Sequence, residues 1–571
     1  MKMRTLLMGA IASAAFAPVA FADGHSGERG RDGDVKILYW QAPSILNPFL
    51  SGGTKDVESS SLIIEPLARF NETGAMIPFL VTEVPTVANG GVSEDLTSIT
   101  WNITPGLTWS DGTPFTSADV KFTADYCMHP EGGCAQLSKF DGVDSVEAID
   151  DLTVKVTFKA PQPNPYGPFV GGENPIIQAA QFADCLGAKA PECTEANFNP
   201  IGTGPFKVIE FRPNDVITME ANENYRVEGK PAFATLTFKG GGDAAAAGRA
   251  VLETGEYDYA WNLQLAPDVI AKMEEAGKGV AIAGFGPLVE RLEMNLTNPS
   301  PDLPAETRST VAEPHPFLSD INVRTALSMA IDRELLTEVG YGKAGTPTCN
   351  LVPAPALYNS DNTGCLTQDI AGANAMLEAA GWVKGSDGIR AKDGVRLSIL
   401  YQTSTNAVRQ DFQALIKDWW QQIGVETELR NLSGSVFFGG DPGSPDTFQK
   451  FYADVEMYAN TFNGTDPQAY LGSRRCGAEP KPDSQWQGEN INRYCDPAYD
   501  ALLDELAGTG DLDKRGEIGR RLNDMLTKDS MVIVPLVNRA RVSAHANSLG
   551  GVVLNVWDSE LWNAADWYRM K

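Results

Sequence analysis

The chain has 571 residues, of which 43% are hydrophobic and 21% charged, and its formal net charge is −28. This length exceeds what one ordinary hydrophobic core can organise, so two or more lobes are expected. The composition is that of a soluble globular protein. The negative charge argues against nucleic acid or an anionic membrane as a partner, because both require a basic surface.

The amino-terminal segment 1–22 has the features of an export signal. Lys2 and Arg4 precede an apolar run over 6–16, and the small-x-small triplet ending at Ala22 is typical of a cleavage site. Cleavage after Ala22 and a periplasmic location are therefore predicted. No other apolar run is long enough to span a bilayer. Residues 23–34 are rich in Gly, Asp and Arg without periodicity, which predicts a flexible leader.

The first half of the mature chain alternates strands and helices. A strand is predicted over 35–40, and an insertion follows with a strand over 98–103 and a helix that begins near Ser117. The stretch 199–206, N-P-I-G-T-G-P-F, is a glycine- and proline-rich corner. It leads into a hairpin predicted over 206–221. A strand over 236–239, a helix over 244–253 and a strand over 257–262 then predict an α/β lobe.

The second half repeats this alternation after a change of composition. Residues 299–316 are rich in Pro, Thr and Glu, which indicates a crossover to a second lobe. Amphipathic or apolar patterns then predict helices and strands. The helices are expected over 320–333, 408–423, 499–506 and 515–526, and the strands over 397–401 and 532–537. The carboxyl-terminal segment is expected to cross back to the first lobe.

Eight cysteines fit an oxidising compartment. They permit about 105 connectivities, so pairing of sequence neighbours is a hypothesis, favoured because each pair brackets a loop-like stretch. The spacings do not match a zinc site. The expected pairs are Cys127–Cys134, Cys185–Cys193, Cys349–Cys365 and Cys476–Cys495.

One pattern resembles a nucleotide site. Residues 240–245 follow a predicted strand, open a helix and match G-x-G-x-x-A, with Asp258 at a suitable distance for a ribose. However, Asp243 would repel a pyrophosphate at the helix start, and a plain strand-to-helix corner explains the glycines equally well. The four histidines form no H-E-x-x-H or His/Cys cluster. We therefore expect no metal, no cofactor and no enzymatic activity.

Aromatic residues suggest where a ligand binds. Six of them stand at or just past the ends of predicted strands, where open α/β lobes bind their ligands. Aromatic walls supply contact area and tolerate varied ligands, although ordinary core packing is the alternative explanation for each residue. The six are Trp40, Trp261, Phe285, Tyr401, Tyr458 and Phe462.

Five blocks, in the expected order, resemble the bacterial extracellular solute-binding proteins of family 5, the dipeptide-, oligopeptide- and nickel-type receptors of ABC importers. They are L-N-P over 46–48, W-S-D-G-T-P-F over 109–115, G-T-G-P-F over 202–206, V-R-x-A-L-S-x-A-I-D-R over 323–333 and N-R-Y-x-D-P-x-Y-D over 492–500. Together they span nearly the whole mature chain.

The resemblance implies an α/β fold with two lobes of the periplasmic-binding-protein type, hinge crossovers between them, and an extra α+β subdomain inserted in the first lobe. It also implies a monomer that captures a peptide-like solute between closing lobes and delivers it to a membrane permease. The expected division is lobe I over 35–65, 201–298 and 538–571, the inserted subdomain over 66–200, and lobe II over 299–537.

One departure from the family concerns the ligand. Peptide-binding relatives often carry an aspartate that pairs with the amino group of the peptide, and Asn463 stands near that position. We therefore expect weaker discrimination for a free amino terminus, unless Asp454, Asp466 or Glu290 substitutes. The expected ligand-binding set adds four residues to the six aromatic ones: Thr54, Glu290, Asn460 and Asn463.

Other functions stay open at this point. The same fold could bind an opine, an oligosaccharide or a metal chelate, or could deliver its ligand to a chemoreceptor or sensor kinase. A secreted nucleotide-dependent enzyme using the Gly240 turn is the rival from a different class.

Overall fold

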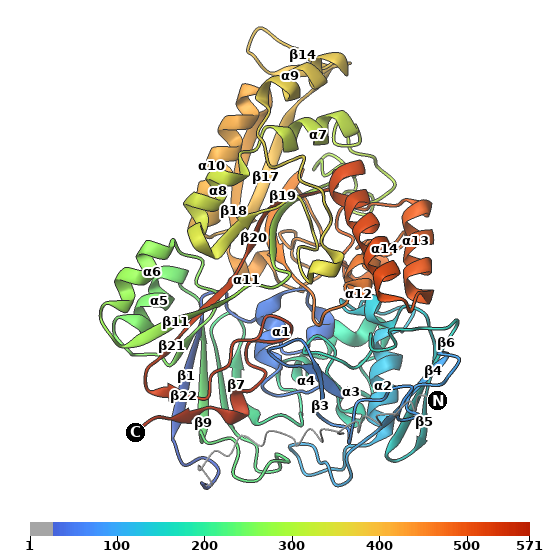
Figure 1. Ribbon diagram of the computed structural model, residues 1–571, viewed down its shortest axis with the longest axis vertical. Helices are drawn as coiled ribbons and strands as arrows, with labels where there is room; N and C mark the ends of the chain where they lie inside the picture. Colours follow the sequence, from blue (N-terminus) through green and yellow to red (C-terminus); the bar gives the residue numbers. More distant parts are fainter. Residues whose placement is uncertain (1–26) are drawn as a thin grey trace, which may run out of the picture.

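A computed structural model describes residues 27–571 and shows two lobes, one above the other (Figure 1). Each lobe is built on a mixed β-sheet with helices packed against it. The prediction of a two-lobed α/β fold is confirmed. The predicted export signal over 1–22 lies outside the described residues.

The sheet of lobe I has seven strands. They are β1 (Asp34–Tyr39), β7 (Phe206–Arg212), β8 (Val216–Ala221), β9 (Thr235–Gly240), β10 (Tyr259–Ala260), β11 (Gly279–Gly284) and β21 (Arg541–Ala546). Their spatial order is β11-β21-β10-β1-β9-β8-β7. β1 pairs in parallel with β9 and β10, so β9, helix α5 (Ala244–Leu252) and β10 form the expected crossover unit.

The glycine- and proline-rich corner at 202–206 holds lobe I to the start of the inserted subdomain. Gly204 N donates to Ile63 O at 2.8 Å and Phe206 N to Leu62 O at 3.2 Å. A Cβ on Gly202 would stand 1.8 Å from Ile63 O, so only glycine allows the two backbones to approach this closely.

The inserted subdomain has its own small sheet beside lobe I. Strands β4 (Ser98–Asn102), β5 (Val143–Asp150) and β6 (Thr153–Phe158) are antiparallel in the order β4-β6-β5. Helix α2 (Ser117–Cys127) begins at a capping box, in which Thr116 N donates to Asp119 Oδ2 at 2.9 Å. This confirms the helix start expected from the sequence.

The sheet of lobe II has six strands. They are β12 (Val289–Met294), β13 (Gly345–Pro347), β17 (Ser398–Ser404), β18 (Glu426–Leu432), β19 (Val455–Asn460) and β20 (Ile533–Arg539). Their spatial order is β13-β20-β12-β19-β17-β18. Helix α10 (Ala407–Gln422) packs on this sheet through Phe412, Ile416 and Trp420. Helices α13 (Pro497–Gly508) and α14 (Leu512–Asp524) form a separate layer above the inserted subdomain (Figure 1).

The helix expected over 320–333 is two helices in the structure. α7 (Ile321–Met329) ends before Ala330, and α8 (Arg333–Gly340) begins after Asp332. The side chain of Asp332 accepts a hydrogen bond from Leu335 N at 3.0 Å, which caps the second helix. The apolar periodicity runs through both helices, so it could not reveal the break.

Two crossovers join the lobes. The first runs from β11 to β12 through residues 285–288, and the second runs from β20 to β21 through Ala540. The first crossover therefore lies before residue 298, where the sequence placed the lobe boundary, and the second lies after residue 537. β12 reads V-E-R-L-E-M, yet all six of its residues are buried, because its charged side chains pair with other buried charges.

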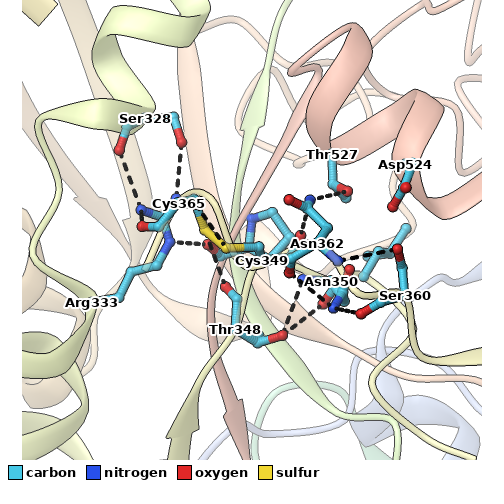
Figure 2. Close-up of a disulfide and its surroundings, with 12 residues drawn as sticks. Ser328, Arg333, Thr348, Cys349, Asn350, Ser360, Asn362, Cys365, Asp524 and Thr527 are labelled. Carbon is cyan, nitrogen blue, oxygen red and sulfur yellow. Dashed lines mark hydrogen bonds between the residues drawn. A yellow bond between two sulfur atoms is a disulfide. The ribbon is translucent and has the colours of Figure 1, made fainter. Parts of the chain in front are cut away.

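All four expected disulfides are present, and none of the eight cysteines is free. Two lie in the inserted subdomain and two in lobe II. Cys349–Cys365 closes a loop whose polar groups form hydrogen bonds both within the loop and to neighbouring segments (Figure 2). Asn350 Nδ2 donates to Ser360 O at 2.8 Å, and Arg333 Nη1 donates to Cys365 O at 2.9 Å.

The described part of the leader contacts lobe I instead of moving freely. Arg29 Nη2 donates to Tyr225 O at 2.8 Å, and Gly30 N donates to Pro231 O at 3.0 Å. The composition of 23–34 indicates flexibility, but these long-range hydrogen bonds fix the chain from residue 29 onward.

Replacing Gly202 by alanine should destabilise the fold strongly. The added Cβ would overlap the carbonyl oxygen of Ile63, so Gly202→Ala should lower the free energy of unfolding by on the order of 3 kcal/mol or more. Gly508→Ala is the matched control, because its Cβ would meet no atom within 4 Å. Urea denaturation followed by tryptophan fluorescence measures both variants. Equal stability of the two variants would contradict the close approach at the corner.

Candidate functional site

The two lobes contact each other along an interface that contains several cavities. A cavity of about 440 Å³ lies between the inserted subdomain and lobe II, and one of about 390 Å³ lies beside residues 44–50. Between them, the hinge cavity measures about 50 Å³ and is lined by residues of both lobes and both crossovers. The other cavities are larger, and one of about 180 Å³ also reaches the second crossover at Arg539 and Ala540. Among these four, only the hinge cavity is lined by residues at both crossovers, Leu288 and Arg539. It is the candidate ligand site.

The hinge cavity combines aromatic, amide and charged side chains from both lobes. Lobe I and the crossovers supply Gln41, Gly52, Thr54, Trp261, Asn262, Leu288, Arg539, Arg541 and Glu560, and lobe II supplies Arg409, Phe438, Phe448, Tyr458, Ala459, Asn460 and Thr461. Its volume is below the roughly 300 Å³ of typical ligand sites. A ligand of several atoms must therefore hold the lobes farther apart or extend into a neighbouring cavity.

Aromatic rings form opposite walls of the hinge cavity. On lobe I, Trp261 stacks on Tyr39 with ring centroids 4.6 Å apart and planes 2° from parallel. On lobe II, Tyr458 contacts Phe448 at 5.3 Å and Phe438 at 6.1 Å between centroids. Rings that are packed against other rings offer a fixed apolar surface to a ligand at little entropic cost.

A buried carboxylate connects the two crossovers below the cavity. Glu290 lies in β12, and its Oε1 accepts from Arg409 Nε at 2.7 Å while its Oε2 lies 3.4 Å from Arg539 Nε. Burial by itself would raise the pKa of Glu290, but the two guanidinium groups outweigh it and hold the pKa below its usual value. Arg539 Nη1 also donates to Asn262 Oδ1 at 3.1 Å. Both lobes are thus joined through one ionised network.

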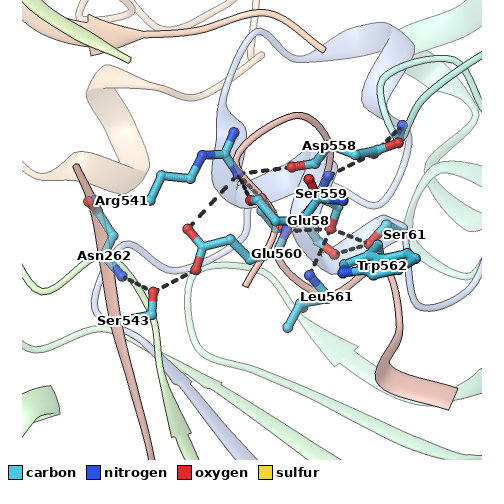
Figure 3. Close-up of polar contacts among 12 residues, drawn as sticks. Glu58, Ser61, Asn262, Arg541, Ser543, Asp558, Ser559, Glu560, Leu561 and Trp562 are labelled. Carbon is cyan, nitrogen blue, oxygen red and sulfur yellow. Dashed lines mark hydrogen bonds and ion pairs between the residues drawn. The ribbon is translucent and has the colours of Figure 1, made fainter. Parts of the chain in front are cut away.

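A second group of charges lies on the lobe I side of the cavity (Figure 3). Arg541 Nη1 is 3.6 Å from Glu58 Oε1 and 4.0 Å from Glu560 Oε1. Glu58 also accepts a hydrogen bond from Ser559 Oγ at 2.5 Å. Burial and the charge of Glu560 raise the pKa of Glu58 to about 7, against the opposing effects of Arg541 and Ser559.

The structure brings four of the ten expected ligand residues to the hinge cavity: Thr54, Trp261, Tyr458 and Asn460. Trp40, Tyr401 and Phe462 lie instead in hydrophobic cores, as the alternative explanation for strand-end aromatics allows. Phe285 is 49% exposed and does not line the cavity. Glu290 is fully buried behind the cavity wall.

Asn463 and the acids that could substitute for it lie elsewhere. Asn463 lines the 440 Å³ cavity, as does Asp466, which is paired with Arg515 at 2.6 Å. Asp454 accepts hydrogen bonds from Leu400 N at 2.6 Å and contacts His315 Nε2 at 2.8 Å. Neither Asp454 nor Asp466 lines the hinge cavity.

Sequence reasoning missed the charged residues of the cavity, which are Arg409, Arg539, Arg541 and Glu560. Arg409 had a usable signal, because it interrupts the apolar face of the predicted helix over 408–423. The alternation R-A-R over 539–541, directly after an apolar strand, was a second one. Glu560 stands in an irregular segment, and its contacts with residues 58, 259 and 543 depend on tertiary structure alone.

The two aspartates of the nucleotide-like pattern at 240–258 both make structural contacts. Asp243 caps α5 by accepting from Ala246 N at 2.7 Å, which places a carboxylate where a pyrophosphate would bind. Asp258 accepts from Lys36 N at 2.8 Å and pairs with Arg569. Both aspartates therefore have partners that a nucleotide would need to displace.

Among residues 27–571, no helix is both long and apolar enough to cross a membrane. The same part of the chain contains no group of three or more His, Cys, Asp or Glu side chains that could hold a metal ion.

Comparison with known proteins identifies the family. The profile of the bacterial extracellular solute-binding proteins, family 5, middle region, matches residues 78–479. The chain belongs to this family of extracellular solute-binding proteins. The glutathione-binding protein GsiB of Shigella boydii is 24% identical over 464 residues, which cover 81% of each chain.

Solved structures share the fold at low sequence identity. The oligopeptide-binding protein AppA of Bacillus subtilis, in complex with a nonapeptide, superposes with a TM-score of 0.81 at 20% identity. The superposition covers 95% of this chain and 100% of the AppA chain. The binding protein AgaA of A. tumefaciens R10, in complex with agropinic acid, has a TM-score of 0.76 at 19% identity and covers 94% of this chain and 99% of its own.

Removing the charge of Glu290 should weaken the connection between the lobes. Glu290→Gln leaves the buried guanidinium groups without a counter-charge and should lower the free energy of unfolding by about 3–5 kcal/mol. The matched control is Glu426→Gln, which breaks the exposed pair with Arg396 and should change stability little. Urea denaturation compares the two, and equal losses would contradict the role of the buried network.

Proposed function

We propose that the protein is the periplasmic receptor of an ABC importer and that it carries a peptide or peptide-like solute between its lobes to the membrane permease. It acts as a monomer after export and cleavage behind Ala22. Membership of the solute-binding family supports this role, and the named relatives include proteins that bind glutathione and a nonapeptide.

The observation that carries the proposal is the position of the hinge cavity. Its lining comes from both lobes and includes Leu288 and Arg539, which stand at the two crossovers. A ligand that contacts both lobes there binds the closed form better than the open form, so it shifts the population toward closure. The closed form is then the signal that the permease recognises.

The chemistry of the cavity suits a zwitterion with apolar parts. Arg409 and Arg539 offer guanidinium groups for a carboxylate, whereas Trp261 and Tyr458 offer apolar walls. Amide groups such as those of Gln41 and Asn262 can satisfy peptide-like N–H and C=O groups once water is excluded. These are the groups that a short peptide presents.

A non-peptide solute is the second candidate. The small volume of the hinge cavity and the structural neighbour AgaA, solved in complex with agropinic acid, favour a compact solute with carboxylate groups. Opines fit this description better than an oligosaccharide does, because the cavity contains three arginines. A metal chelate stays possible for the fold, and a nucleotide-dependent enzyme has only the Gly240 turn in its favour.

Mass spectrometry of the solute that is released from freshly purified, denatured protein tests the proposal. Short peptides or peptide-like molecules are expected. Recovery of only sugars or a metal chelate would contradict the peptide-like ligand. Sequencing of the exported protein should find Asp23 at the amino terminus, and size-exclusion chromatography with light scattering should find a monomer.

Truncating Trp261 should reduce affinity for the recovered solute. Trp261→Ala removes an aromatic wall of the hinge cavity, and loss of such a buried anchor typically weakens binding roughly 30-fold or more. Isothermal titration calorimetry measures the change after the solute is stripped and added back. Ile209→Ala is the control, because Ile209 is an exposed residue of β7 that lies outside the cavity lining and outside both crossovers, so affinity should be unchanged. Equal effects would place the ligand elsewhere.

A further inference from the structure

Two carboxylates share one small region of the lobe I wall. Glu58 lies in helix α1 (Thr54–Ser60), and Glu560 lies in the irregular segment between β22 (Leu549–Gly550) and β23 (Tyr568–Arg569). Glu58 Oε1 accepts from the backbone N–H of Glu560 at 3.2 Å, so the two side chains are held next to each other (Figure 3). Only Glu560 lines the hinge cavity.

The two oxygens of Glu560 have different surroundings. Oε2 accepts hydrogen bonds from Tyr259 Oη at 2.7 Å and from Ser543 Oγ at 2.5 Å. Oε1 has no hydrogen bond from any described residue, and the nearest cation is Arg541 Nη1 at 4.0 Å. Glu560 has a relative exposure of only 2%, and it lines the hinge cavity. The oxygen is free to accept a donor from a ligand in the cavity.

The charges around the pair do not balance. Among residues 27–571, Arg541 is the single cation within 4.0 Å of both carboxylates, and its Nη1 also donates to the carbonyl oxygens of Asp558 and Asn555. Tyr39 and Tyr259 also face the pair, and burial raises the pKa of each phenol well above its usual value, so both are neutral. With both glutamates ionised, the group therefore carries one net negative charge.

We propose that Glu560, backed by Glu58, binds the ammonium group of the transported solute. This inference rests on the proposed function and assigns the amine-binding acid within the same site. An ammonium at Oε1 of Glu560 would supply both the missing donor and the missing positive charge.

An amine site at Glu560 would replace the aspartate that peptide-binding relatives often carry near the position of Asn463. The other candidate acids are each engaged: Glu290 by Arg409 and Arg539, Asp454 by His315, and Asp466 by Arg515. Glu560 differs from them because it lines the hinge cavity and keeps one oxygen without a donor. Recognition of a free amino terminus is therefore expected, and lobe I supplies it.

Binding should also release a proton near neutral pH. The pKa of Glu58 is about 7 because of burial and the charge of Glu560, so the ligand-free pair retains a proton below that pH. A bound ammonium takes the place of this proton. Affinity for a free amino terminus should therefore fall by up to about tenfold for each pH unit below 7, and it should also fall above about pH 8, where the α-amino group of the peptide loses its own proton.

Two synthetic tripeptide libraries test the proposal, one with free amino termini and one acetylated. Native mass spectrometry at pH 8 measures which peptides the stripped protein retains. Retention of the free library with at least tenfold less retention of the acetylated one supports the assignment. Equal retention of both libraries overturns it while leaving a peptide receptor in place. Retention of neither library contradicts the proposed function itself, and the amine site with it.

Variants separate this role from a structural one. Glu560→Gln keeps acceptors for Tyr259 and Ser543 but removes the charge, so it should abolish the preference for free amino termini. Glu58→Gln keeps Glu560 and should remove the dependence of affinity on pH between 6 and 7. Glu210→Gln, an exposed acid of lobe I, is the control and should behave as the wild type. Thermal unfolding confirms that each variant is folded.

Calorimetry in buffers of different ionisation enthalpy gives a second measurement. The wild type and the most strongly retained free peptide should release up to one proton per peptide at pH 7, and Glu58→Gln should release none. Proton uptake, or release that Glu58→Gln does not change, would overturn the assignment.

Discussion

The carboxylate of Glu290 is the contact on which the arrangement of the lobes depends. It lies in β12, the strand that follows the first crossover. It binds Arg539 at the end of β20, the strand that precedes the second crossover. Arg409 from α10 completes the network. An uncompensated charge at this depth is costly, so each partner constrains the others. The same arginines line the hinge cavity, so the contact between the lobes is also part of the proposed binding surface.

The positive and negative side chains of the hinge cavity lie in different parts of it. Guanidinium groups near the crossovers suit an acidic group of a solute, and the Glu58–Glu560 pair on lobe I suits a basic one. A solute with both groups would contact both crossovers and lobe I at once. Because closure excludes water, each of these contacts becomes stronger in the closed form than in the open one. Charge complementarity and lobe closure thus favour the same solutes.

Local patterns predicted the fold well, because helices and strands are encoded by periodicity. The hairpin over 206–221 and the helix over 408–423 match β7, β8 and α10 closely. The crossover was misplaced because β12 carries three charged residues that are buried as pairs, which no local pattern reveals. The site was only partly predictable for the same reason. Strand-end aromatics such as Trp261 could be named, whereas Glu560 acquires its role from residues more than 300 positions away.

The disulfides have a consequence for how the protein is made. Each cysteine is joined to the next one along the chain, with separations of 7, 8, 16 and 19 residues. A chain that enters an oxidising compartment amino terminus first would present each cysteine with its correct partner before any later one arrives. Oxidation in order of emergence then gives the native connectivity without reshuffling. No disulfide joins one lobe to the other, so the finished protein keeps its hinge free to move.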